Sequence, residues 1–202
     1  MVQSILIILG TLLPLISSFV YVRSILRGRS KPQRMTRLLM VVISGLALAA
    51  LLADGYSPGV WLAGASFAQA ILVWALSFRY GMGGKDRLDI TCLVLCVCGA
   101  VLWYSTGESL VGLWAAIATD FIAVLPSLAK TIRLPHTESW PFYALDTVAS
   151  ACIMLATPLL FREQAYPAYL LLINLLFVLV IWLVPHRRHV RGMDDRMSTP
   201  LG

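Results

Sequence analysis

The sequence is poor in charge. Only 13% of its 202 residues are Asp, Glu, Lys or Arg, whereas 59% are hydrophobic and the mean hydropathy is +0.81. A soluble domain usually carries about 25% charged residues, nearly twice this share. A chain with so few charges cannot present a polar surface to water on every side. The composition therefore excludes an ordinary soluble domain and predicts a protein that is surrounded by lipid.

Cysteines are also few, and no catalytic motif accompanies them. All four lie inside apolar runs, so we expect no disulfide framework, and no set of His or carboxylate side chains joins them at the spacing of a zinc site. The sequence lacks a Gly-x-Ser-x-Gly elbow and a phosphate-binding glycine loop. We therefore expect no metal, no cofactor and no enzymatic activity, and a membrane enzyme is the least favoured alternative. The cysteines are Cys92, Cys96, Cys98 and Cys152.

Apolar runs divide the chain into segments of membrane-spanning length. A helix needs about 20 mostly apolar residues to cross the hydrocarbon core. No run has the length or alternation of a barrel strand. The sequence predicts an all-α polytopic membrane protein with a single membrane domain at 1–185 and a short, mobile cytoplasmic tail at 186–202. The seven predicted spans are 3–22, 38–54, 60–80, 89–105, 111–132, 141–161 and 166–185.

Positive charge alternates between the loops. The first, third and fifth loops and the tail are rich in Lys and Arg, the second and fourth contain none, and the sixth has only Arg162. Because Lys and Arg stay on the cytoplasmic side, the N-terminus is predicted outside and the C-terminus inside, with Tyr166 in an outer aromatic belt. The net charge of +6 thus reports orientation and not nucleic-acid binding. Short loops and a short tail favour a bacterial inner membrane.

The first and last three predicted spans share a layout. Residues 11–80 and 118–185 each begin with a proline-containing helix, at Pro14 or Pro126, and continue through a basic turn. The third helix of each half carries one amide near its middle, Gln69 or Asn174. Because one span separates the halves, both would enter the membrane from the same side. The layout predicts parallel three-helix repeats, 3–80 and 111–185, joined by a linker helix at 89–105, which is a known transporter plan.

One segment resembles a known family. LPSLAKTIR at 125–133, followed by Thr-Glu-Ser at 137–139, resembles the PQ-loop signature, in which a Pro-Gln pair precedes a basic turn and a Ser-rich step. The motif covers 120–139, and the layout covers the whole chain. Ser127 replaces the glutamine of the motif, and Pro32-Gln33 falls in a loop instead of a helix. The resemblance implies the three-one-three plan of SWEET-like carriers, whose third helices each lend an amide to a central solute site.

Polar residues inside the spans are the candidate site residues. A carboxylate at the centre of a helix costs about 2.5–3.5 kcal/mol on insertion scales, and such residues usually face a cavity or a partner. Asp120 lies near the middle of its span, and Asp146 shares a helical stripe with other polar residues. Hydrogen bonds that only hold helices together, and static kinks at the prolines, are the structural alternatives. We predict substrate binding by Gln69, Asn174, Asp146, Tyr143 and Ser150, proton coupling through Asp120 and Asp146, and hinges at Pro14, Pro126 and Pro158.

These features lead to a hypothesis of function. The chain is predicted to move a small polar solute by alternating access, with proton coupling through carboxylates, because burial favours the protonated form of such a group. A non-transporting receptor or scaffold is the main alternative, since KDEL receptors share the helix plan. A vitamin importer of the nicotinamide riboside class, in the opposite orientation, is another. The expected partners are the lipid bilayer and the solute, and the sequence leaves open whether the chain forms a homo-oligomer.

Overall fold

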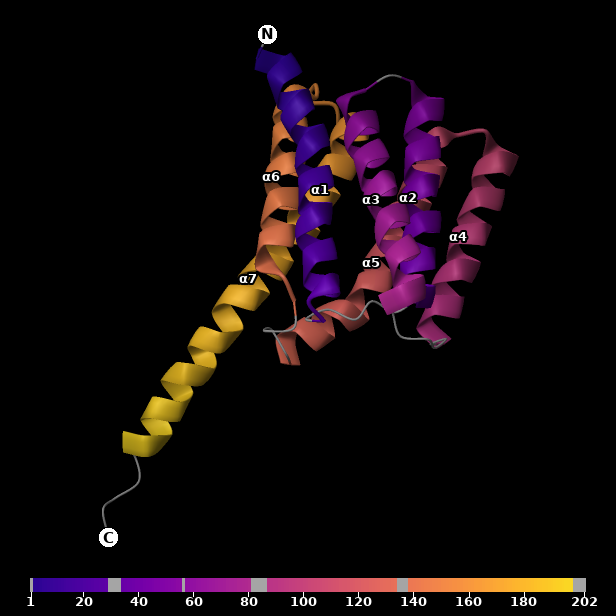
Figure 1. Cartoon of the computed structure of the whole chain (residues 1–202). Coiled ribbons are helices and arrows are strands. Elements are labelled where there is room, and N and C mark those ends of the chain that lie inside the picture. Colours follow the sequence, from indigo (N-terminus) through magenta and orange to yellow (C-terminus); the bar gives the residue numbers. More distant parts are fainter. Residues whose placement is uncertain (1, 29–33, 56, 81–86, 134–137, 198–202) are drawn as a thin grey trace.

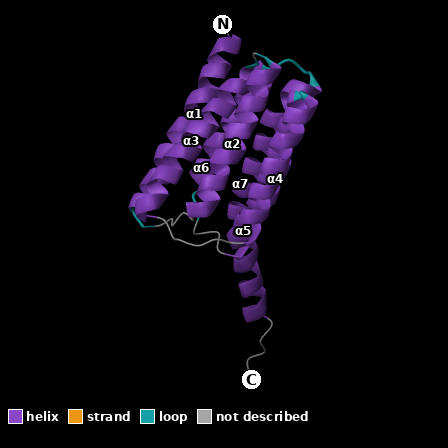
Figure 2. Ribbon diagram, turned by 90° about the vertical axis from the view of Figure 1, so that its right-hand side faces the viewer, coloured by secondary structure: helices purple, strands orange, loops and turns teal. Residues whose placement is uncertain are grey.

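The computed structural model describes residues 2–28, 34–55, 57–80, 87–133 and 138–197. Over these ranges the chain forms seven α-helices and no strand, so the predicted all-α fold class is confirmed. The helices run side by side, with short connections at the two ends of the molecule (Figures 1 and 2). They are α1 (Val2–Leu26), α2 (Arg34–Asp54), α3 (Pro58–Tyr80), α4 (Arg87–Thr106), α5 (Ser109–Arg133), α6 (Trp140–Ala156) and α7 (Phe161–Met197).

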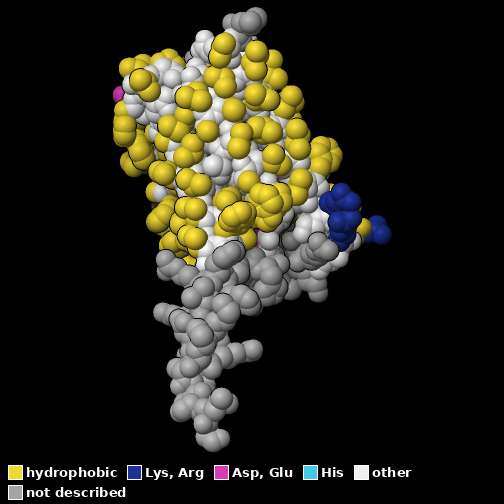
Figure 3. Space-filling view, turned by 90° about the vertical axis from the view of Figure 1, so that its left-hand side faces the viewer, with side chains coloured by type: hydrophobic (Ala, Val, Ile, Leu, Met, Phe, Trp, Pro, Cys, Tyr) yellow, Lys and Arg dark blue, Asp and Glu magenta, His cyan; other side chains and the backbone are white. Residues whose placement is uncertain are grey.

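Five of the described helices, α1, α2, α3, α5 and α7, are long and apolar enough to cross a membrane. The shorter apolar stretches Ile90–Thr106 and Trp140–Ala156 lie in α4 and α6. Hydrophobic side chains cover the face shown in Figure 3, and its coloured charged side chains lie near the two ends. Because lipid offers the backbone no hydrogen bonds, a chain with such a surface must satisfy its own amide groups, and helices do so within one segment.

Glycine and proline set several helix ends. Gly55 and Gly107 directly follow α2 and α4 and have φ angles of 113° and 69°, a region that disfavours a Cβ atom. The predicted span 141–161 is wrong at its end, because α6 stops at Ala156. Thr157 is extended, with φ −97° and ψ 139°, as expected for a residue before proline. Pro158 therefore lies between α6 and α7 and bends no helix, which contradicts its predicted role as an intramembrane hinge.

The last helix differs from the prediction at both of its ends. It begins at Phe161, five residues before the predicted start at 166, so Pro167 lies in its second turn. Membrane helices tolerate interior prolines, because neighbouring groups satisfy the freed backbone carbonyl. The helix also continues to Met197, so the described part of the predicted tail is helical, and it extends away from the other helices in Figure 1.

Six of the helices form a closed ring in which each packs against two neighbours. The order around the ring is α1, α6, α7, α5, α2, α3 and back to α1. Helix α3 also contacts α6 and α7 across the ring, and α4 lies outside it against α5 and α2. The ring order therefore brings helices from both ends of the sequence around one centre.

The contacts of the first and last three helices follow the same pattern. Helix α3 packs along both α1 and α2, and α7 packs along both α5 and α6. The described backbones of α1 and α2 do not lie side by side, nor do those of α5 and α6, although the side chain of Arg37 on α2 reaches Tyr21 on α1. Between the triplets, α1 packs on α6 and α5 packs on α2. Exchanging α1 with α5, α2 with α6 and α3 with α7 reproduces these contacts. The packing of α3 on α6 is the exception, since the described backbones of α7 and α2 do not lie side by side.

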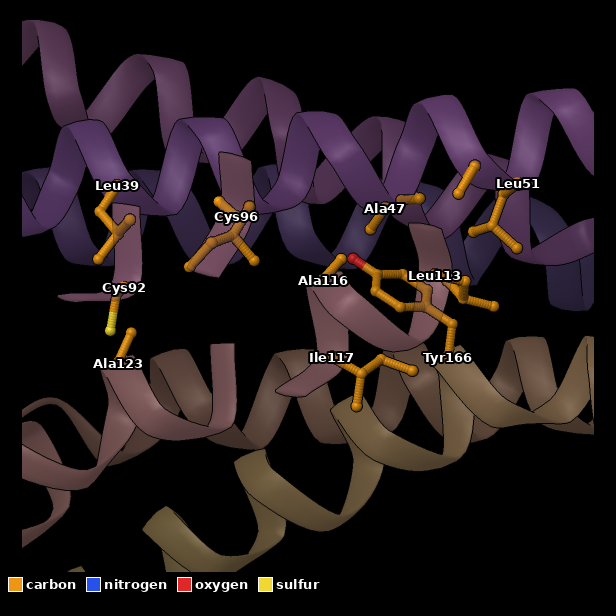
Figure 4. Packing of buried hydrophobic residues seen from close by; sticks show 13 residues of the cluster. Leu39, Ala47, Leu51, Cys92, Cys96, Leu113, Ala116, Ile117, Ala123 and Tyr166 are labelled. Atoms are coloured by element: carbon orange, nitrogen blue, oxygen red, sulfur yellow. The ribbon is translucent and has the colours of Figure 1, made fainter. Parts of the chain in front are cut away.

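Helix α4 is attached to the ring through a buried apolar cluster. Cys92 and Cys96 point from α4 toward α2 and α5, where Leu39 and Ala123 belong to the same cluster (Figure 4). The helices approach closely here, because a Cβ atom on Gly99 would lie only 2.3 Å from the Cβ of Ala115. Cys92 and Cys96 thus serve as small apolar core residues.

Charge separates toward the two ends of the helices. The described arginines of α1 to α5 lie at the ends of α1, α3 and α5 and at the starts of α2 and α4, whereas Arg162 lies in the first turn of α7 at the opposite end. Asp54, Glu108 and Glu163 lie at the opposite end, and Glu138 lies at the arginine end. The central parts of the helices carry Asp120 and Asp146. The arginines at the arginine end are Arg23, Arg27, Arg34, Arg37, Arg79, Arg87 and Arg133.

Candidate functional site

A cavity of about 210 Å³ lies inside the ring. Side chains from all six ring helices line it, so each triplet supplies part of its wall. Pockets that hold drug-sized ligands usually measure about 300–1,000 Å³. The cavity is therefore suited to a small solute. Its lining combines apolar side chains with amides, hydroxyls and carboxylates.

The residues predicted from sequence to bind substrate meet at this cavity. Gln69, Tyr143, Asp146, Ser150 and Asn174 all line it. Gln69 lies on α3 and Asn174 on α7, helices that hold opposite positions in the ring. The shared polar position in the third helix of each triplet therefore corresponds to a shared location in space.

The remaining predicted residues are only partly brought together. Asp120 and Pro14 line the cavity. The side chain of Pro126 falls outside the described part of the chain, although its backbone belongs to α5. Pro158 follows α6, as described above. Of the three predicted hinges, only Pro14 is thus seen both inside a helix and against the cavity.

Asp146 joins three helices through hydrogen bonds. Ser17 on α1 donates from its Oγ to Asp146 Oδ1 over 2.6 Å. Gln69 on α3 donates from Nε2 to Ser17 Oγ over 3.0 Å and lies 3.4 Å from Asp146 Oδ2. Ser17 is fully buried. The carboxylate is therefore held in place by two neutral groups of the other triplet while it still faces the cavity.

Asp120 has a partner within its own triplet. The hydroxyl of Tyr169 on α7 donates to Asp120 Oδ2, and both side chains line the cavity. Tyr166, one turn earlier on α7, also lines the cavity and is buried, and its ring lies beside Leu113 and Ala116 (Figure 4). Its predicted place in an outer aromatic belt is therefore wrong, because its side chain turns into the ring and away from the headgroup region.

Asn174 is less constrained than Gln69. Its Nδ2 donates to the carbonyl of Leu170 in the same helix over 2.8 Å. Within the described residues its Oδ1 accepts no hydrogen bond, and the side chain lines the cavity. The amide oxygen of Asn174 is thus available to a donor on a bound solute.

One end of the cavity is built from charged and aromatic residues. Arg37 and Glu138 line it at the end where the arginines gather. The Arg37 guanidinium donates to the hydroxyl of Tyr21 and lies 4.9 Å from the centre of that ring. Tyr143 stacks on Phe177, with ring centres 4.4 Å apart and planes within 4°. These side chains are positioned where they could close the cavity from that side.

The other end is filled with small and apolar groups. Leu62 is 1% exposed and Ala63 is fully buried near the start of α3, and Pro58 and Pro167 are buried beside them. Arg37 and Glu138 at the arginine end are only half-buried. The end where Asp54 and Glu163 lie is therefore apolar, whereas charged side chains line the cavity at the arginine end.

Sequence reasoning missed Ser17, Tyr169 and Arg37. Ser4, Thr11 and Ser18 recur every seven residues in the sequence, a spacing that favours Ser18 over Ser17 as the inward-facing hydroxyl. In the structure Ser18 bonds the Pro14 carbonyl of its own helix. Tyr169 is a mid-span tyrosine on the helix that carries Asn174, which could have marked it. No sequence signal distinguishes Arg37 from the neighbouring loop arginines, because its role depends on how α2 packs.

Comparison with family models, with curated proteins and with solved structures found no match. Function must therefore be argued from the chemistry of the cavity. Hydroxyl, amide and carboxylate groups around one small cavity can bind a polar solute by hydrogen bonds and charge. The site has no arrangement of nucleophile and base among the described side chains that would indicate covalent chemistry, and these side chains form no cluster suited to a metal ion.

Proposed function

We propose that this protein moves a small polar solute across a membrane by alternating access. The observation that carries the proposal is the cavity inside the ring, into which each helix triplet brings one amide. Asp120 on α5 and Asp146 on α6 also line it. Polar and ionisable groups in the middle of apolar helices are costly, and they commonly mark substrate or ion pathways.

The proposed architecture has seven transmembrane helices, with two three-helix bundles joined by α4. Helix α4 has 20 residues, and at about 1.5 Å per residue it matches the roughly 30 Å hydrocarbon core. The 17 residues of α6 equal the lower limit of about 17 for a spanning helix. The arginine-rich end would face the cytoplasm of a bacterial inner membrane, with the N-terminus outside.

The matching contacts of the two triplets support alternating access. The interface of α1 with α6 corresponds to that of α5 with α2 when the triplets are exchanged. Two related interfaces on either side of a central site allow one bundle to rock against the other. Pro14, inside α1 and against the cavity, is a suitable hinge.

The carboxylates are suited to proton coupling. The described hydrogen-bond partners of Asp146 and Asp120 are the neutral groups of Ser17, Gln69 and Tyr169. A carboxylate held by neutral donors can bind and release a proton without breaking an ion pair. Asp146 also connects the two triplets, so a change in its charge would alter the contact between them. The solute and the proton would thus act on the same interface.

Two-sided accessibility tests the proposal without knowledge of the solute. Ser44 is half-buried, lines the cavity from the middle of α2 and can be replaced by cysteine. In right-side-out and inverted vesicles, a small membrane-impermeant thiol reagent should label Ser44→Cys from both sides. Val97→Cys, on the exposed face of α4, is the lipid-facing control and should react from neither side. Labelling of the unsubstituted protein measures the background from the native cysteines, none of which lines the cavity.

Each result has a distinct meaning. Labelling of Ser44→Cys from both sides supports a cavity that opens alternately. Labelling from one side only would contradict transport and favour a receptor with a fixed pocket. Absence of labelling from either side would contradict a solute pathway and favour a scaffold.

A further inference from the structure

The charged groups of the cavity are mostly negative. Among the residues that the structure describes, its lining contains the carboxylates of Asp120, Glu138 and Asp146 and one guanidinium, that of Arg37. Three acidic groups and one basic group give a formal charge of −2 when all are ionised. Arg37 belongs to the first turn of α2, and both Arg37 and Glu138 lie at the arginine-rich end. Asp120 and Asp146 are therefore the only charged groups in the central part of the described lining.

The carboxylates keep capacity for a ligand. An ionised carboxylate offers about four lone-pair positions. Among the described residues, Asp146 accepts one hydrogen bond from Ser17 and one longer one from Gln69, and Asp120 accepts one from Tyr169. These donors fix the orientation of each carboxylate without neutralising it. A cation in the cavity would supply the missing charge.

Aromatic rings form much of the remaining wall. Phe142, Tyr143, Tyr166, Tyr169 and Phe177 line the cavity from α6 and α7. The faces of aromatic rings attract cations, and the attraction is strongest where water is excluded. Carboxylates combined with rings from two neighbouring helices are thus suited to an ammonium group that carries methyl or methylene substituents.

A zwitterionic solute fits this lining less well. Its carboxylate would need a cationic partner, and Arg37 already donates to Tyr21 and lies over that ring. Glu138 lines the same end of the cavity and would repel a second carboxylate. A neutral solute would leave the carboxylates without a counter-charge. The lining therefore matches a solute that carries positive charge alone.

We propose that the solute is a small organic cation, an ammonium compound without an acidic group, held between Asp120 and Asp146 and against the aromatic wall. This inference rests on the proposed function, since it names the class of solute for the same cavity. The positive charge would replace the proton at the carboxylates, so that solute and proton compete for one site.

The test uses the full-length protein in lipid nanodiscs and three probes that share one shape. Choline is the cation, glycine betaine is the zwitterion and dimethylbutanol is the uncharged carbon isostere of choline. Ethanolamine, ethylene glycol and glycine repeat the comparison with a primary ammonium. Thermal unfolding is followed by the fluorescence of the six tryptophans. Choline or ethanolamine at millimolar concentration should raise Tm, and the neutral and zwitterionic probes should not.

Charge-removing variants locate the effect. Asp146→Asn and Asp120→Asn should each raise the Kd for the stabilising cation at least tenfold, the change that about 1.4 kcal/mol produces. Asp54→Asn makes the same chemical change on a carboxylate that bonds Ser109 at the far end of α2, and it should leave the Kd unchanged. Asp146→Glu, which keeps the charge, should retain selectivity for the cation even if its Tm without ligand is lower.

Several results would overturn the inference. Equal stabilisation by the neutral or zwitterionic probe would show that positive charge is not recognised. Stabilisation by neither ammonium compound would do the same, because the attraction of two carboxylates does not depend on the substituents of the cation. In both cases, two-sided labelling of Ser44→Cys would still support transport of another solute. One-sided labelling together with cation binding would instead indicate a receptor for the cation.

Discussion

Replacing Ser17 with alanine tests the hydrogen-bond network that connects the two helix triplets. Ser17 Oγ lies 2.6 Å from Asp146 Oδ1 and 2.9 Å from the Pro14 carbonyl. A hydroxyl has one proton to donate, and the shorter contact to a carboxylate is the stronger one. Ser17→Ala therefore removes a donor from Asp146 and an acceptor from Gln69.

The expected loss follows from two magnitudes. Hydrogen bonds to charged groups contribute about 1.5–3 kcal/mol in proteins, whereas interhelical hydrogen bonds in membranes average about 0.6 kcal/mol. The bond to Asp146 has a carboxylate acceptor and a fully buried donor, so we expect Ser17→Ala to lower the free energy of unfolding by about 1–2 kcal/mol. In a double-mutant cycle with Asp146→Asn, we expect a coupling of about 1 kcal/mol.

Unfolding by SDS in mixed micelles would measure these values, and Ser18→Ala is the matched control. Ser18 is the next residue, is 1% exposed and donates only to the carbonyl of Pro14, 2.8 Å away in its own helix. Ser18→Ala should therefore lower the free energy of unfolding by less than about 0.5 kcal/mol, because no group on another helix loses a partner. Equal effects of the two substitutions, or a coupling near zero between Ser17 and Asp146, would refute the network.

Other substitutions test the packing and the second carboxylate. Gly99→Ala should destabilise by about 1–3 kcal/mol, because its Cβ would meet Ala115 at 2.3 Å. Gly64→Ala should instead stabilise by up to about 1 kcal/mol through helix propensity, since its nearest neighbour is 4.0 Å away. SDS unfolding can measure both changes in the free energy of unfolding, and changes of the same sign would contradict the packing. Tyr169→Phe removes the donor to Asp120 and should lower the free energy of unfolding by about 1 kcal/mol. An unchanged free energy of unfolding would contradict that hydrogen bond.

The sequence predicts the number of helices and much of the polar lining, because both depend on local signals. Apolar runs of spanning length form helices wherever they are placed in lipid. Gln69, Asp146 and Asn174 could be identified because an amide or carboxylate inside such a run must face a cavity or a partner. Their meeting at one cavity agrees with the layout of the two halves.

Features that depend on helix packing could not be predicted in the same way. Ser17 and Ser18 are adjacent and chemically identical, and only the packing of α1 on α6 brings one of them to Asp146. Pro158 was wrongly predicted to lie inside a helix, whereas Pro167 does lie inside one, because a proline can end a membrane helix or lie within it. The choice depends on whether neighbouring groups satisfy the freed carbonyl.

The measurement that tests alternating access most directly is the distance between spin labels on opposite triplets. One pair would join Ala53 on α2 to Leu155 on α6 at the end where Asp54 and Glu163 lie. The other would join Phe78 on α3 to Leu183 on α7 at the arginine-rich end. All four side chains are exposed. We predict two distances for each pair, and conditions that lengthen one pair, such as a change of pH or added ammonium solute, should shorten the other. A single unchanging distance for both pairs would contradict a transporter.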